Sequence, residues 1–166
     1  MFKTETIYPL IEIVENLKSS NVASISSLIN VYGEMEMMLE DNPAFMDTLQ
    51  LIKSKLMGLI GKITTLQTGM IFVELGIPNA ESLERADKEQ IEQLIKRFYE
   101  IIFKYKGLEE TKEGRMFVKS QEIKKQITEQ MIEVILKVYQ AACDALKKWD
   151  SNLEIYDVET IKRTLH

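Results

Sequence analysis

Apolar residues recur with a helical period along the stretch from Pro43 to Gly76. They occur at alternating spacings of four and three residues, at Phe45, Leu49, Ile52, Leu56, Leu59, Ile63, Leu66, Met70 and Val73. This period, close to about 3.5 residues, predicts a long amphipathic helix whose apolar seam packs along other helices. Asn42 can cap its start, and Gly76 can take the left-handed conformation that ends a helix. At about 1.5 Å per residue, such a helix spans roughly 50 Å.

Other segments of the chain carry a similar helical pattern. Turn and capping residues separate them, and Asp87 with Gln90 has the form of a capping box. The helices predicted in this way cover about residues 1–18, 21–40, 87–106, 120–148 and 157–165. The segment 108–119 is the least periodic, so we predict a flexible loop there.

These patterns together predict an all-α protein. We expect an elongated antiparallel helical bundle with five main helices and a short C-terminal one. The 166 residues are enough for a single domain, 1–166, with a sizeable core. Only 3 Pro and 7 Gly occur, and most of them separate periodic segments, which favours long helices over many short strands.

Few residues of the chemically reactive types are present. The single histidine is His166 and the single cysteine is Cys143. This composition excludes Ser-His-Asp and Cys-His catalysis, histidine-based zinc sites, CxxC sites and internal disulfides. Cys143 lies beside the apolar stripe of its helix, so we predict a small, partly buried residue and not a reactive thiol. We expect no enzyme activity, no metal and no cofactor.

Net charge and hydropathy limit the partners. The charge of −5 disfavours bulk attraction to nucleic acid. The most apolar window, 56–77, contains Lys62, Gln67 and Glu74, and charges near the centre of a bilayer are costly. We therefore predict a bundle helix there, and membrane contact that is peripheral at most.

Acidic residues and methionines occur together near the end of the second predicted helix. The acidic run is Glu34, Glu36, Glu40 and Asp41, and the methionines are Met35, Met37 and Met38. We interpret the acidic run as a solvated helix face, with a hard-cation site or a contact to a basic partner as the alternative. Methionine either fills gaps in a core or forms an adaptable binding surface, and we predict core positions here.

Basic residues outnumber acidic ones between residues 104 and 125, by seven to four. Such a patch can contact anionic lipid or an acidic helix, and a solvated loop is the other interpretation. The candidate contact residues are Lys112, Arg115, Lys119, Lys124 and Lys125.

The long helix has a second apolar edge beside its seam, formed by Met57, Ile60, Met70, Ile71 and Leu75. The apolar arc is therefore wider than one neighbouring helix requires. Either the chain's own helices enclose this edge, or part of it is exposed and receives a partner helix. In the second case, Met57, Ile60 and Ile71 are the candidate partner-binding residues.

Several segments carry a resemblance to a known family. They are 8–14, 24–32, 47–75, 120–139 and 156–165. In their order they resemble the C-terminal region of the sixth subunit of the conserved oligomeric Golgi complex, a vesicle tether built from helical rods. That subunit similarly ends with a long helix carrying a tyrosine, a turn and a short amphipathic helix. The chain departs from the family at Val158, where proline is usual, and in a shorter connector at 77–88, which leaves open a related tether such as the exocyst subunit with a similar tail.

The resemblance implies a fold of stacked helical bundles and a non-catalytic role. It implies a peripheral protein on the cytoplasmic face of the Golgi, acting in retrograde vesicle tethering, with other tethering-complex subunits and SNARE proteins as partners. It also implies that residues 1–166 are the C-terminal part of a longer subunit. Two other classes stay open: a helical adaptor or regulatory domain that binds a partner helix or peptide outside the Golgi, and a helical ligand-binding or enzymatic bundle.

Overall fold

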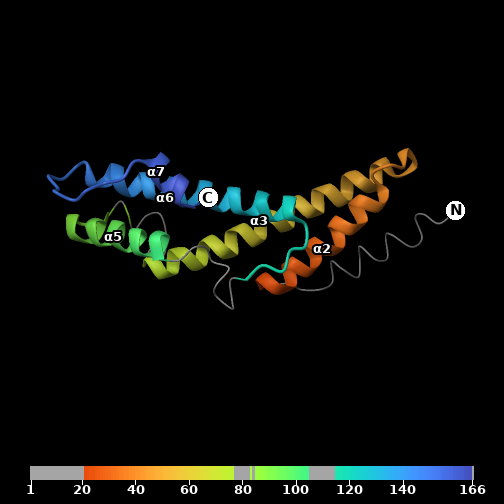
Figure 1. The fold of residues 1–166 in the computed structure, drawn as a ribbon, viewed down its shortest axis with the longest axis horizontal. Helices are drawn as coiled ribbons and strands as arrows, with labels where there is room; N and C mark the ends of the chain where they lie inside the picture. Colours follow the sequence, from red (N-terminus) through yellow and green to blue (C-terminus); the bar gives the residue numbers. More distant parts are fainter. Residues whose placement is uncertain (1–20, 77–82, 84, 105–114, 166) are drawn as a thin grey trace.

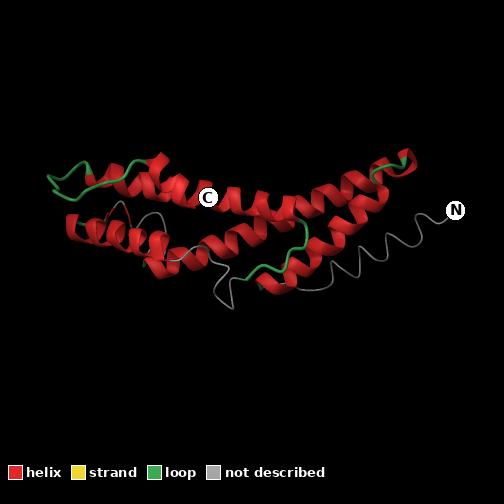
Figure 2. Cartoon of the chain, in the orientation of Figure 1, coloured by secondary structure: helices red, strands yellow, loops and turns green. Residues whose placement is uncertain are grey.

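The computed structural model of the protein describes residues 21–76, 83, 85–104 and 115–165. All regular structure in these ranges is helical, and no strand occurs among them (Figure 1, Figure 2). The helices are α2 (Val22–Leu39), the 3-10 helix η1 (Pro43–Phe45), α3 (Met46–Leu75), α5 (Lys88–Lys104), α6 (Gln121–Leu146) and α7 (Val158–Leu165). The predicted all-α helical bundle is therefore confirmed, whereas the helix predicted at 1–18 lies outside the described residues.

The long predicted helix has the ends that its local sequence specifies. Asn42 caps a 3-10 turn that begins at Pro43, and its side chain accepts a hydrogen bond from the backbone N–H of Ala44 at 3.1 Å. The chain then continues as α3 to Leu75. Gly76 ends the helix with φ of 74°, a left-handed conformation that glycine adopts without a Cβ clash.

The other predicted helix starts are also capped. Asn21 caps α2 and Ser120 caps α6, each accepting a hydrogen bond from the backbone N–H three residues later. At the start of α5, the backbone N–H of Gln90 donates to the Asp87 carboxylate at 2.9 Å. The backbone N–H of Asp87 in turn donates to the Gln90 side chain at 3.0 Å. This reciprocal pair is the capping box that the sequence predicts.

The helices form an elongated body in which the α2–α3 hairpin makes one end, and α5, the end of α6 and α7 lie toward the other (Figure 1). The first half of α6 packs on α3, and its second half packs on α5 and α7. Helices α2 and α3 form an antiparallel hairpin. Helices α3 and α6 run in the same direction, since Met57 lies beside Gln126 and Thr64 lies beside Gln130.

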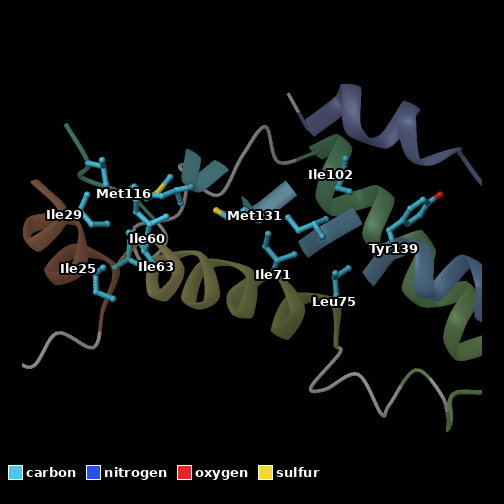
Figure 3. Packing of buried hydrophobic residues seen from close by; sticks show 14 of the residues in the cluster. Ile25, Ile29, Ile60, Ile63, Ile71, Leu75, Ile102, Met116, Met131 and Tyr139 are labelled. Carbon is cyan, nitrogen blue, oxygen red and sulfur yellow. The ribbon is translucent and has the colours of Figure 1, made fainter. Parts of the chain in front are cut away.

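One cluster of buried side chains includes residues from α2, α3, α5, α6 and α7, and Figure 3 shows part of it. Within α3, Leu56 and Ile63 of the predicted seam are buried. The seam prediction is wrong near the end of the helix, where Val73 is 77% exposed and Ile71 and Leu75 are buried instead. The reason is that α3 packs against α2 along its first part and against α6 and α5 further on, so the buried face turns around the helix.

Two glycines on the solvent side of α3 test which face of this helix is exposed. Gly58 and Gly61 are exposed, and a Cβ added at either would meet no atom within 4 Å. Since glycine inside a helix costs about 0.5–1 kcal/mol relative to alanine, Gly58→Ala and Gly61→Ala should each raise the free energy of unfolding by about that amount.

Gly76→Ala is the matched control, and its effect on the free energy of unfolding should have the opposite sign. The alanine would have to keep the left-handed φ of 74°, which is unfavourable for a residue with a Cβ, and that Cβ would lie 3.3 Å from the Arg97 guanidinium. The free energy of unfolding should therefore fall by about 1–2 kcal/mol. Thermal melts of the three variants measure these changes. A neutral Gly76→Ala would contradict the left-handed helix end.

Candidate interaction surface

The predicted partner-binding edge of α3 is largely enclosed. Ile60 is 1% exposed and Ile71 is 7% exposed, and both lie in the core cluster (Figure 3). Met57 is 53% exposed, and its sulfur accepts a hydrogen bond from the Gln126 side chain at 3.5 Å. This corrects the prediction for Ile60 and Ile71, which are not surface residues. Helices α2 and α6 together cover an arc of α3 that is wider than one neighbour could cover.

The predicted basic patch is spread along the chain and partly neutralised. Lys112 lies outside the described residues, and the other candidates, Arg115, Lys119, Lys124 and Lys125, lie between residue 115 and the first turns of α6. Lys119 pairs with Glu34 at 3.1 Å, and Lys125 pairs with Glu129 at 3.8 Å. Two of these charges therefore have partners inside the chain. Contact with anionic lipid or an acidic helix stays a prediction.

The predicted flexible loop at 108–119 is corrected over its last residues. Met116 and Val118 are buried, and the residues that alternate with them are exposed. Asn30 of α2 clamps this extended segment: its side-chain N–H donates to the Phe117 carbonyl, and its side-chain oxygen accepts from the Lys119 N–H, both at 2.8 Å. No alternating pattern was visible in the sequence here, because Phe117, between the two buried residues, is also apolar although it is 55% exposed.

The methionines near the end of α2 are found at the tip of the α2–α3 hairpin. Met37 is 77% exposed, Met38 is 80% exposed and Met46, at the start of α3, is 60% exposed. The prediction of core positions is therefore wrong for Met37 and Met38, whereas Met35 is partly buried against the core. We call residues 34–47 the hairpin tip.

A ring of hydrogen bonds joins α5, α6 and the segment before α7. The Tyr156 N–H donates to the Tyr99 hydroxyl at 3.1 Å, and the Tyr139 hydroxyl donates to the Tyr156 carbonyl at 2.6 Å. The two hydroxyls lie 2.8 Å apart, so Tyr99 donates to Tyr139 and the ring closes. Burial, and then the hydrogen bond from Tyr99, raises the pKa of Tyr139, so this hydroxyl stays protonated and cannot act as a base at neutral pH.

Cys143 lies one helical turn after Tyr139 and is 4% exposed. The sequence predicted a partly buried residue, and the structure shows a fully buried one. Burial raises the pKa of its thiol. Because the thiolate is the reactive form, this cysteine is a poor nucleophile.

A pocket lies between the end of α3 and the first half of α5. Its volume is about 440 Å³, and it is lined by Leu75, Gly76, Leu83, Arg85, Ala86, Gln90, Ile91, Gln93, Leu94 and Arg97. The two arginines are the charged groups among these residues, and no carboxylate accompanies them in the described lining. The described lining of the pocket therefore carries positive charge and contains no acid–base pair.

Metal and membrane chemistry have little support in the described residues. Within these ranges, no three His, Cys, Asp or Glu side chains come together as metal ligands. The stretch Pro43–Leu75 is long and apolar enough to cross a membrane by length and composition. The core helix of a soluble protein passes the same test, and here Ile60, Ile63 and Ile71 are buried against the chain's own helices.

Comparison with known proteins identifies no relative. No protein-family model, no curated protein and no solved structure matches the chain. The likeness to the Golgi tether subunit therefore rests on the sequence pattern alone.

Proposed function

We propose that the chain is a non-catalytic protein-interaction scaffold of the kind found in vesicle-tethering complexes. The observation that carries this proposal is the elongated all-α body (Figure 1), whose hairpin tip carries the exposed side chains of Met37, Met38 and Met46. Long helices arranged in this way offer surfaces that suit partner helices, and exposed apolar groups that gather in one place usually mark an interaction site.

The resemblance to the sixth subunit of the conserved oligomeric Golgi complex supplies the cellular setting of the proposal. In that setting the chain acts at the cytoplasmic face of the Golgi in intra-Golgi retrograde transport. Its partners are other tethering-complex subunits and SNARE proteins, and its contact with the membrane is peripheral.

The ionisable groups of the described residues support a scaffold over an enzyme. A general acid or base works best with a pKa near the operating pH. The raised pKa values of Tyr139 and Cys143 move away from neutrality, as does the lowered pKa of Asp157, whose carboxylate accepts a hydrogen bond from the Thr160 backbone. Every shift resolved among the described residues has this direction.

Co-purification from cells tests the proposal. The tagged chain, expressed at a native level, should recover Golgi tether subunits above the amount recovered by the tag alone, as measured by mass spectrometry. Recovery of partners from another compartment would instead support the adaptor alternative. Recovery of no partner at all would contradict the scaffold role.

A ligand-binding role has one observation in its favour, the arginine-lined pocket between α3 and α5. A ligand that binds only the native state at about 100 times its dissociation constant stabilises that state by about 2.7 kcal/mol. Thermal melts with a panel of small carboxylates and phosphates test this role. A shift that Arg85→Gln with Arg97→Gln abolishes would favour ligand binding over the scaffold.

A further inference from the structure

The hairpin tip combines exposed apolar side chains with a concentration of negative charge. Its exposed apolar groups are Met37, Met38 and Met46. Its acidic residues are Glu34, Glu36, Glu40, Asp41 and Asp47, and no Lys, Arg or His occurs between residues 33 and 50. The tip is therefore both the most methionine-rich exposed part and a strongly acidic part of the described chain.

Part of this charge has no partner inside the described chain. Glu34 and Glu36 pair with lysines at 3.1 Å and 3.6 Å. Glu40, Asp41 and Asp47 form no ion pair with any described residue, and all three are exposed. Their negative charge is available to a partner.

The backbone holds the tip in a defined shape. The Asn42 N–H donates to the Leu39 carbonyl at 3.1 Å, and the Phe45 N–H donates to the Asn42 carbonyl at 3.0 Å. Leu39 is 8% exposed and anchors the end of α2 in the core. The hairpin projects beyond the start of α6, so no described helix covers the tip (Figure 1). A surface that is fixed before binding costs less ordering entropy when a partner arrives.

We propose that the hairpin tip binds a basic amphipathic helix of a partner protein. The apolar face of that helix would lie on the methionines, and its Lys and Arg side chains would lie beside Glu40, Asp41 and Asp47. Methionine is unbranched and polarisable, so it adapts to different apolar surfaces. Complementary charge speeds association and selects against acidic partners.

The charge of the tip also argues against a second copy of this chain as the occupant. Contact between two tips would bring two sets of unpaired carboxylates together, and like charges at close range oppose association. The inference rests on the proposed scaffold role and adds to it the chemistry of one partner.

Fluorescence anisotropy with a labelled synthetic peptide tests the proposal. The probe is a peptide of about five helical turns, built from Leu and Lys so that the leucines fall on one face. A peptide of the same pattern with Glu in place of Lys is the charge control. The whole chain should bind the lysine peptide with an affinity that falls as salt rises, and it should not bind the glutamate peptide.

Two double variants separate the apolar and charged contributions. Met37→Gln with Met38→Gln removes apolar surface, and Glu40→Gln with Asp41→Asn removes charge. Each pair should weaken binding by about tenfold or more, which corresponds to about 1.4 kcal/mol.

Glu154→Gln with Glu159→Gln is the matched control, because it removes the same charge from exposed positions near α7. It should leave the dissociation constant within about twofold, since charges far beyond a Debye length are screened. Circular dichroism should show all these variants folded, because the replaced side chains are exposed.

Three outcomes would overturn the proposal. Equal weakening by the control pair would indicate unspecific attraction to an acidic protein, and unchanged binding in both tip variants would place the site elsewhere. A rise in mass with concentration that the methionine variant abolishes, measured by light scattering, would assign the tip to a second copy. Any of these results leaves the co-purification test of the scaffold role standing, because that test uses the cellular partners and not this peptide.

Discussion

Ile60→Asp is expected to prevent folding, whereas Met57→Asp, three residues earlier on the same helix, should leave the chain folded. Ile60 is 1% exposed near the middle of α3. A buried carboxylate without a partner costs several kcal/mol, and losing the isoleucine adds about 2–5 kcal/mol. Their sum rivals the total stability of a domain, about 5–15 kcal/mol. Met57 is 53% exposed, so water can solvate an aspartate at that position. Circular dichroism and thermal melting measure both results.

Ile63→Ala measures how much the same buried region contributes to stability, without introducing a charge. Ile63 is 0% exposed, so its truncation should lower the free energy of unfolding by about 2–5 kcal/mol. A normal cooperative melt of Ile60→Asp would show that this position reaches solvent, and the predicted binding edge would have to be reconsidered. Unfolding of Met57→Asp would show that α6 covers more of α3 than the exposure of Met57 indicates.

Helix ends could be predicted because they depend on local chemistry. Asn42, Gly76 and the Asp87–Gln90 pair act on backbone groups within a few residues of themselves. Such contacts are the same in almost any fold, so the sequence alone is enough to place them. The seam of α3 was also predictable over the middle of the helix, at Leu56 and Ile63.

The choice of buried residues could not be predicted near the end of α3. Whether Val73 or Ile71 faces the core depends on where α6 and α5 meet α3, and this is a non-local property. The extended segment that carries the buried Met116 and Val118 is similar, since Asn30, more than 80 residues away, holds it through hydrogen bonds to Phe117 and Lys119. Helical periodicity carries no information on such contacts.

The candidate binding surface was visible in the sequence only as two separate patterns. The acidic run and the methionines are adjacent in sequence, but methionine can take a core role or a surface role, and the sequence alone did not decide between the two for Met37 and Met38. What decides between them is that the hairpin extends past the first turn of α6 (Figure 1). The proposed interaction at the tip follows from this length difference and from the charge around it.

Tyr139→Ala is expected to lower the free energy of unfolding by about 3–5 kcal/mol, the range for truncating a buried aromatic side chain. Tyr139 is 1% exposed, and its ring stacks on Phe98 with centroids 4.8 Å apart. Tyr139→Phe keeps the ring and removes only the hydroxyl, which leaves the Tyr156 carbonyl and the Tyr99 hydroxyl without this partner. It should cost about 1–3 kcal/mol. Denaturant titration of both variants separates packing from hydrogen bonding.

Alkaline pH provides a second measurement of the Tyr139 hydroxyl. Its pKa is raised in the native state, so as the pH rises above about 10, the ordinary tyrosine pKa, the unfolded state loses this proton first. The contribution to stability is therefore complete below about pH 10 and falls above it by about 1.4 kcal/mol per pH unit. The wild-type chain should lose more stability than Tyr139→Phe between about pH 9 and pH 11, because the variant lacks this proton. Equal losses would mean that the hydroxyl is open to solvent, and the hydrogen-bonded ring that joins α5, α6 and the segment before α7 would be disproved.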